Sequence, residues 1–179
     1  TGFEESSYKE KGTRIKWNPA VKTRNDRDAI RKAVLDDRID VIATDHAPHT
    51  KEEKANTYLK APSGGPLVQH SLISMLQLVE REVFSTEDVV RKMSHAVADC
   101  FRVNKRGYLR KGYFADMVLV HKKAHTVEKE NILAKCGWSP FEGETFDYAV
   151  THTFVNGHLV YENGTFYEDV KGKRLKFDR

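Results

Sequence analysis

The feature that most constrains this chain is a strand–helix–strand succession near its N-terminal end. Residues 14–18 (RIKWN) alternate in polarity like a strand, residues 23–35 have one apolar face like a helix, and residues 40–44 form a second strand-like run. Thr23 and Asp26 are placed to cap the start of the helix. Two strands joined through a helix normally lie parallel in one sheet, so this succession predicts an α/β fold with a parallel sheet.

The rest of the chain divides into a helical part and a β-rich part. Residues 67–80 and 85–101 each carry apolar side chains at helical spacing. Further on, turns alternate with short strands, and an Asn-Gly turn within residues 151–161 predicts a hairpin. We therefore expect the end of a parallel α/β domain over residues 1–105 and a small β-rich domain over residues 106–179.

A candidate site follows the second predicted strand, in the stretch VIATDHAPHT. Asp45, His46 and His49 lie within five positions, and Asn18 ends the preceding predicted strand. The carboxyl ends of parallel strands meet at one edge, where α/β barrels carry their catalytic groups. Residues 50–66 then form a long polar, glycine-containing segment that reads as a functional loop. Asp and Pro are also ordinary turn residues, so spacing alone leaves the catalytic and the turn interpretations of Asp45 both open.

Charge and composition narrow the range of partners. The chain has 30 Lys and Arg against 26 Asp and Glu, spread along the sequence without a basic stripe interleaved with aromatic residues. We therefore expect no nucleic-acid partner. No apolar run is long enough to span a bilayer and no leader opens the sequence, which predicts a cytoplasmic protein without a membrane partner. Cys100 and Cys136 fit no zinc-binding pattern and are expected to be reduced thiols.

Six segments, in order along the chain, resemble dihydroorotases of the amidohydrolase superfamily. They are KWNPAVKTRND, TDHAPH, KAPSGG, GYLRKGYFADMVLV, CGWSPFEGETF and THTFVNGHLVYENG, and together they reach from about residue 14 to residue 164. The resemblance implies the C-terminal part of a (β/α)8 TIM-type barrel followed by a small β-domain. The H-x-H pair, the bridging lysine and the two later metal histidines of the family are absent, and HKKAH (residues 121–125) is expected to be solvated surface. By itself, such a fragment is expected to be inactive.

The resemblance also implies a reaction and its residues. Dihydroorotases interconvert N-carbamoyl-L-aspartate and L-dihydroorotate in pyrimidine biosynthesis, and a zinc-bound hydroxide attacks the ring amide in the hydrolytic direction. Asp45 would be both a metal ligand and the general base and acid, with one or two zinc ions held mostly by residues outside this chain. Asn18, His49, Ser63 and Gly64 would bind the small-molecule substrate. The protein is thus expected to be a zinc-dependent cyclic amide hydrolase.

Two other functions stay open on the sequence. A related cyclic amidohydrolase, such as an allantoinase or a hydantoinase (dihydropyrimidinase), would share the barrel and the metal chemistry but usually lacks the second histidine of D-H-A-P-H. A non-catalytic homologue would keep the fold and lose ligands. His46 is expected to support the surroundings of Asp45, and His70 and His95 to be packing or surface residues of helices. A homodimer is possible.

Overall fold

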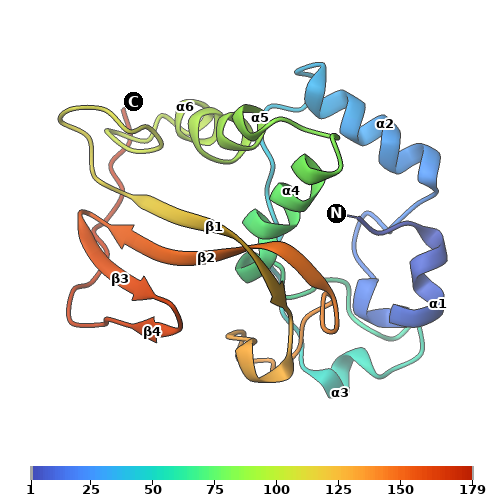
Figure 1. The fold of residues 1–179 in the computed structure, drawn as a ribbon. Coiled ribbons are helices and arrows are strands. Elements are labelled where there is room, and N and C mark those ends of the chain that lie inside the picture. Colours follow the sequence, from blue (N-terminus) through green and yellow to red (C-terminus); the bar gives the residue numbers. More distant parts are fainter. Residues whose placement is uncertain (1, 179) are drawn as a thin grey trace.

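A four-stranded antiparallel sheet packs against a group of helices in the computed structural model, which describes residues 2–178 (Figure 1). The α-helices are α1 Tyr8–Lys11, α2 Arg24–Leu35, α3 Lys51–Lys54, α4 Ser71–Glu80, α5 Thr86–Val90 and α6 Ala96–Cys100. The 3-10 helices are η1 Glu5–Ser7, η2 Gly12–Ile15, η3 Val68–His70 and η5 Lys129–Asn131, and η4 Arg91–His95 is a π-helix. The strands are β1 Met117–Thr126, β2 Thr145–Val155, β3 His158–Glu162 and β4 Thr165–Phe166.

Capping boxes begin the helices where the sequence predicts them. The Thr23 hydroxyl accepts from the Asp26 N–H at 3.3 Å, while the Asp26 carboxylate accepts from the Thr23 N–H at 3.1 Å. Ser85 and Asp88 make the same reciprocal pair at 3.1 and 3.0 Å. Each box satisfies two of the backbone donors that a helix start leaves unpaired. The predicted starts of α2 and α5 are therefore confirmed.

The predicted parallel strands over residues 14–18 and 40–44 are wrong. Residues 12–15 form η2, and residues 16–18 and 40–45 belong to no strand. The reason is that the turn at residues 63–65, here called the glycine turn, lies between them. The Gly64 N–H donates to the Lys16 carbonyl at 3.0 Å, and the Ala47 N–H donates to the Gly65 carbonyl at 3.2 Å. The two segments thus hydrogen-bond to this turn and not to each other, and one isolated parallel bridge, His46 to Gly65, is formed.

Two other elements differ from expectation in detail. The helix predicted over residues 85–101 is α5, η4 and α6 in succession, with a π-helical turn in its middle. The long polar loop contains the short helix α3, begun by a Thr50–Glu53 capping box with hydrogen bonds of 2.9 and 3.2 Å. The T-x-x-E spacing was a readable signal for this helix.

The β-rich part forms a meander in the order β1-β2-β3-β4. In the β1–β2 pair Met117 faces Phe154 and Thr126 faces Thr145. The predicted hairpin is confirmed: Asn156 and Gly157 join β2 to β3 with φ of 54° and 82°, the left-handed conformation that two-residue hairpin turns require.

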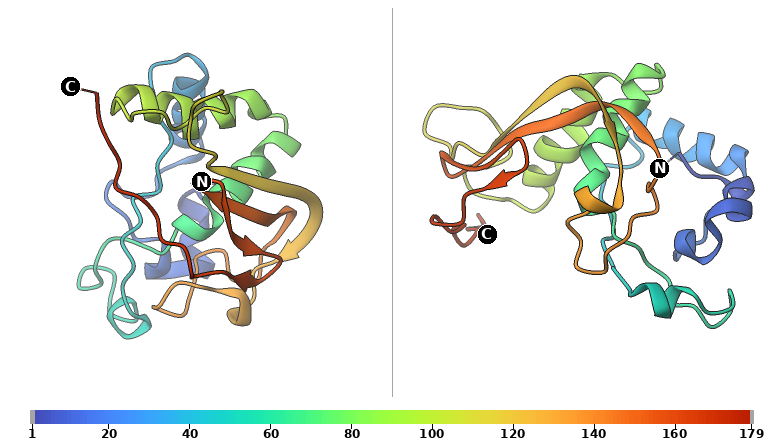
Figure 2. Two further views of the ribbon diagram at one scale, coloured as in Figure 1. Left: turned by 90° about the vertical axis from the view of Figure 1, so that its left-hand side faces the viewer. Right: turned by 60° about the horizontal axis from the view of Figure 1, so that its bottom comes forward.

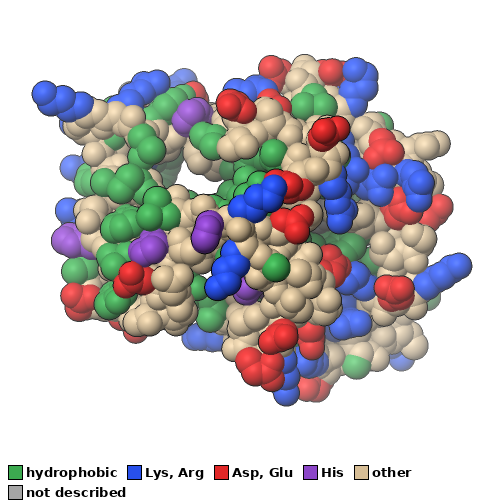
Figure 3. Space-filling model, viewed as in Figure 1, with side chains coloured by type: hydrophobic (Ala, Val, Ile, Leu, Met, Phe, Trp, Pro, Cys, Tyr) green, Lys and Arg blue, Asp and Glu red, His purple; other side chains and the backbone are tan. Residues whose placement is uncertain are grey.

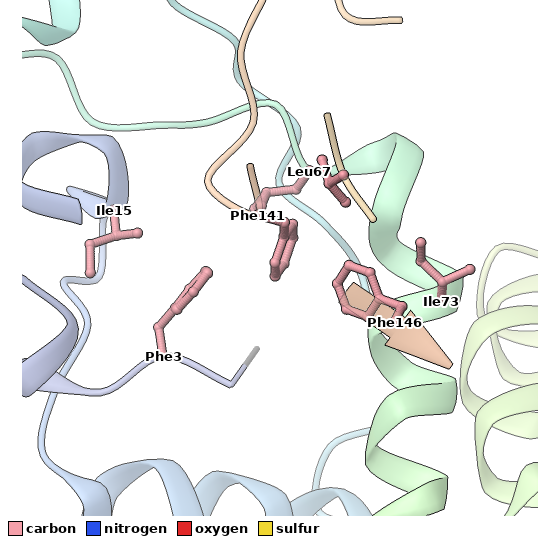
Figure 4. Packing of buried hydrophobic residues seen from close by; sticks show 7 residues of the cluster. Phe3, Ile15, Leu67, Ile73, Phe141 and Phe146 are labelled. Atoms are coloured by element: carbon pink, nitrogen blue, oxygen red, sulfur yellow. The ribbon is translucent and has the colours of Figure 1, made fainter. Parts of the chain in front are cut away.

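One hydrophobic cluster joins the two parts of the chain. It combines side chains from before residue 80 with side chains from after residue 126, as Figure 4 shows: Phe3, Ile15, Leu67, Ile73, Val127, Phe141 and Phe146. A second cluster packs α2, α4 and α5 together: Val34, Met75, Leu76, Leu78, Phe84 and Val89. Helix α4 therefore lies between the sheet on one side and α2 on the other, as the two views in Figure 2 also show.

Residues 2–178 include an apolar hollow at the surface, and residues near the C-terminal end return to the segment after α6. A pocket of about 350 Å³ between α4, α5, η4 and β1 is lined mostly by aliphatic side chains, and Figure 3 shows the molecule hollowed between these helices and the sheet. The C-terminal segment pairs back through an antiparallel bridge between Val103 and Phe177. Within residues 2–178, no helix has both the length and the apolar character needed to cross a bilayer.

Candidate active site

Asp45 lies at the end of the extended segment that follows α2. Its backbone has a φ of 47°, a left-handed conformation that is uncommon for residues other than glycine and that asparagine and aspartate tolerate best. The side chain is exposed, and it makes no hydrogen bond or ion pair with any of residues 2–178. An aspartate that only stabilised a turn would bond to the turn's own backbone. The carboxylate of Asp45 is instead free for a ligand.

The His46 ring is held by backbone groups at the start of η3. Its Nδ1 accepts from the Leu67 N–H at 3.1 Å and from the Val68 N–H at 3.2 Å. A ring nitrogen that accepts two N–H bonds carries no proton, so the neutral ring has its proton on Nε2. This arrangement ties the residue next to Asp45 to the turn that precedes α4.

His49 connects three segments at the mouth of the site. Its Nε2 lies 3.1 Å from the Ser63 carbonyl oxygen, and its Nδ1 lies 3.3 Å from the Glu53 carboxylate. Both partners are acceptors, so a neutral ring donates to one of them and a protonated ring to both. The indole Nε1 of the buried Trp138 donates to the His49 carbonyl at 2.7 Å. His49 is therefore held by contacts to α3, to the glycine turn and to the β-rich part of the chain.

The Ser63–Gly64 turn is shaped by its glycine. Gly64 has a φ of 128°, and a Cβ there would lie 2.5 Å from the Ala47 carbonyl oxygen, so only glycine fits without a shift. Its N–H donates to Lys16 and its carbonyl accepts from Lys54. Both backbone groups of Gly64 are thus hydrogen-bonded within the chain. Asn18 is exposed beside this turn, before a cis peptide bond to Pro19.

A pocket of about 430 Å³ adjoins these residues. Its lining comes from the D-H-A-P-H segment, from α3 and from the segment before Trp138: His46, Pro48, His49, Thr50, Glu53, Ala134, Lys135 and Cys136. The structure therefore brings His46 and His49 together, while Asp45 and Asn18 lie outside this pocket. Lys135 and Cys136 are additional lining residues that the site prediction missed, although the segment CGWSPFEG, which begins at Cys136, was visible in the sequence.

The described residues do not fit a complete zinc site. A catalytic zinc ion normally takes three protein ligands. Nowhere within residues 2–178 do three His, Cys, Asp or Glu side chains lie close enough together to hold a metal ion. Asp45 can contribute at most one ligand.

Comparison with known proteins places these features in a family. Residues 9–160 match the amidohydrolase family. The chain is 38% identical to a dihydroorotase of Clostridium acetobutylicum over 154 residues, which is 85% of this chain and 36% of that protein. It is 37% identical to a dihydroorotase of Clostridioides difficile over 159 residues, 88% of this chain and 37% of that protein. The chain thus spans little more than a third of the length of these relatives.

Solved structures agree on the fold. An L-hydantoinase (dihydropyrimidinase) from Arthrobacter aurescens superposes with a TM-score of 0.83 at 25% identity, covering 92% of this chain and 38% of that protein. A D-hydantoinase from a Thermus species superposes with a TM-score of 0.84 at 18% identity, over 93% of this chain and 38% of that protein.

Proposed function

Because the chain belongs to the amidohydrolase family, we propose that it is part of a dihydroorotase, which interconverts N-carbamoyl-L-aspartate and L-dihydroorotate. One observation carries the proposal: 36–38% identity to dihydroorotases from several organisms over at least 84% of this chain. In the whole protein, residues 1–105 would complete a (β/α)8 barrel and residues 106–179 would belong to a small β-domain. The enzyme would act in pyrimidine biosynthesis in the cytoplasm.

We assign the proton transfers to Asp45. Its carboxylate is exposed and has no partner within residues 2–178, so it is free to accept the proton of the attacking water and to deliver it to the leaving ring nitrogen. The zinc expected from the family would polarise the amide carbonyl. Asp45 would supply one of its ligands, and the other ligands would come from a part of the protein outside this chain.

Substrate binding is assigned to groups around the glycine turn. The His49 ring, the Asn18 amide and the Ser63 N–H and hydroxyl would contact the polar groups of dihydroorotate, and Gly64 would shape the turn that presents Ser63. Dihydroorotate is an anion, and the positive charge of Lys135 in the adjoining pocket would favour its approach.

A hydantoinase is the second candidate, supported by the superposition with the Arthrobacter aurescens protein at 25% identity. The higher identity to dihydroorotases favours the first candidate. His49 also favours it, because its ring is fixed at the mouth of the site by Ser63 and Glu53, and hydantoinases usually lack this second histidine.

A substrate panel tests the proposal. A longer protein that contains these residues is assayed with dihydroorotate, hydantoin and allantoin, with its metal content measured in parallel. We expect kcat/KM for dihydroorotate to exceed the other two values by about 100-fold or more, because the other substrates would leave polar groups of the site without a partner. A preference for hydantoin or allantoin would select the related cyclic amidohydrolase, and no turnover of any substrate with metal bound would select the non-catalytic homologue.

The chain alone gives a further expected outcome. Prepared as these 179 residues, it should neither retain zinc through dialysis nor turn over dihydroorotate, because Asp45 alone cannot provide the three ligands of a catalytic zinc site. Stoichiometric zinc with turnover near that of the longer protein would contradict this expectation. Light scattering of the longer protein would decide whether it is a homodimer, which the sequence leaves open.

A further inference from the structure

Lys54, at the end of α3, is a buried cation beside the proposed substrate site. Its side chain is only 2% exposed. The ammonium donates to three backbone carbonyls, those of Pro62 at 2.9 Å, Gly64 at 2.9 Å and Lys16 at 3.3 Å. Two of these carbonyls flank Ser63, and the third lies two residues before Asn18. The ammonium therefore bridges the two backbone segments that carry proposed substrate contacts.

Lys16 makes the reciprocal connection. Its ammonium donates to the carbonyls of Tyr58 and Ala61, both at 2.6 Å. The Thr13 hydroxyl in turn donates to the Lys54 carbonyl. Two lysines and a threonine thus tie the loop between α3 and the glycine turn to the segment that ends at Asn18.

The number of carbonyls around Lys54 matches the number of protons on an ammonium. A lysine ammonium has three donors and no acceptor, and buried charges persist only when their hydrogen bonds are satisfied. Within residues 2–178, no carboxylate forms an ion pair with Lys54, and Lys16 is the charged group that faces it. Burial, with a smaller effect from Lys16, lowers the pKa of Lys54 to about 8. The ammonium therefore remains largely charged at neutral pH and keeps one proton for each carbonyl.

We propose that Lys54 is a positioning residue of the substrate site: its ammonium fixes the Ser63–Gly64 turn against the Lys16–Asn18 segment. The two segments carry the proposed substrate contacts Asn18 and Ser63, which are both exposed, and the Ser63 carbonyl also meets the His49 ring. Lys54 itself touches no substrate. The effect on turnover rests on the proposed dihydroorotase function, whereas the effect on the order of the loop does not.

The test compares variants of the longer protein. Lys54→Met removes the charge and keeps the length, Lys54→Arg keeps the charge, and Lys51→Met is the matched control, because Lys51 is exposed on the same helix. Hydrogen exchange of residues 58–64, the KM and kcat for dihydroorotate, and metal content are measured for each. In Lys54→Met we expect exchange in this segment to be about tenfold faster or more, the scale of losing charge-assisted hydrogen bonds.

The kinetic constants separate positioning from a general structural role. Lys54→Met should raise KM about tenfold and lower kcat much less, with metal content unchanged. Lys54→Arg should recover part of the loss, and Lys51→Met should match the wild type. Unchanged exchange and KM in Lys54→Met would overturn the proposal. If Lys54→Met does not fold, Lys54→Gln, which keeps two donors, is measured instead. If neither variant folds, the role of Lys54 is purely structural and the positioning role is overturned.

The exchange measurement also separates this inference from the proposed function. If the wild type does not turn over dihydroorotate, the function is wrong, while faster exchange in Lys54→Met still supports the role of Lys54 in ordering the loop.

Discussion

Asp45 combines two features that a simple turn residue does not need. It has a left-handed backbone with φ of 47°, and its carboxylate has no partner within residues 2–178. Unusual backbone conformations persist where the surroundings enforce them, and they concentrate at functional sites. The residue next to it, His46, is held by the N–H groups of Leu67 and Val68, so the chain that carries Asp45 is anchored on that side.

The first prediction concerns Asp45→Asn in the longer protein. The amide keeps the shape of the carboxylate but cannot accept the proton, so kcat should fall by about 100-fold or more, the usual scale of acid–base catalysis. Steady-state kinetics and elemental analysis are carried out on the same preparation. Near-normal kcat with metal retained would assign the proton transfers to another group.

The second prediction separates substrate recognition from metal binding. His49→Ala removes the ring that meets Ser63 and Glu53, so kcat/KM for dihydroorotate should fall between about threefold and 100-fold, the range for one lost neutral or charged hydrogen bond. Asn18→Ala should act likewise, mainly through KM, and metal content should stay unchanged in both. His121→Ala, at an exposed position of β1, is the control. Loss of metal in step with activity in His49→Ala would identify His49 as a ligand.

At this scale the sequence suggests candidate polar groups more readily than the residues that support them. Asp45 and His49 stand out because an acid and histidines after a strand-like run are chemically conspicuous. Lys54 does not, because KEEK reads as a solvated helical turn, and nothing local indicates that one of its two lysines points inward toward carbonyls far along the chain. The contacts of Gly64 could not be predicted either, since its partners Lys16, Ala47 and Lys54 come from three other segments.

Among the elements, the π-helix η4 holds the segment that leads to Asp45. The Lys92 carbonyl accepts from the Ile42 N–H at 3.0 Å. The Lys92 ammonium, in a side chain only 2% exposed, donates to the Ile39 carbonyl at 2.5 Å and pairs with Asp37 at 2.7 Å. One residue of the π-helical turn thus anchors both ends of residues 39–42, and π-helical turns often occur at functional sites.

The third prediction is that Lys92→Met destabilises the fold. It leaves the Ile39 carbonyl without its charged donor, which costs about 1–3 kcal/mol of the free energy of unfolding. Arg91→Met is the matched control, because Arg91 shares the Asp37 partner but is half-exposed and does not reach Ile39. Urea denaturation measures both variants. Equal destabilisation by the two would contradict the special role assigned to the contact between Lys92 and the Ile39 carbonyl.

The sequence predicted an element correctly where a few neighbouring residues are enough to form it. The capping boxes at Thr23 and Ser85 and the Asn156–Gly157 turn are local devices, and each appears where predicted. Strand pairing over residues 14–18 and 40–44 is not a local property. It depends on which segments of the chain lie next to each other in the folded molecule, and here the glycine turn lies between these two.

At the scale of the whole molecule, one hydrophobic cluster joins residues 1–105 to residues 106–179, which the sequence predicts to be separate domains. Phe3 and Ile15 share a cluster with Phe141 and Phe146, and the buried His70 lies at this junction, with its Nδ1 3.3 Å from the Ser139 hydroxyl. The His70 side chain is 1% exposed, and its Nε2 has no hydrogen-bond partner within residues 2–178. This junction could not be read from periodicity, which describes one segment at a time.

The fourth prediction concerns stability in acid. Burial, with a smaller effect from His125, lowers the pKa of His70 from 6.5 to about 4. The unfolded chain therefore binds a proton at His70 from pH 6.5 downward while the folded chain does not, and stability falls as pH drops from 6.5 to 4. The loss is on the order of 3 kcal/mol.

Denaturation of the wild type and of His70→Gln across this pH range checks the fourth prediction. The glutamine variant should lose most of the acid slope, whatever its stability at pH 7, and His121→Gln, at an exposed histidine of β1, should keep it. An unchanged slope in His70→Gln would assign the acid sensitivity to other groups.

The position of β1 at the end of the strand order has a consequence for handling the protein. Within residues 2–178 no strand pairs with the outer side of this ten-residue strand, and Val118 and Leu119 on it are about half exposed. A long, unpaired, partly apolar edge is a template for adding another strand. While that edge stays uncovered, we expect the chain to aggregate by pairing of β1 between molecules. A charged substitution at Leu119 is the simplest way to prevent this.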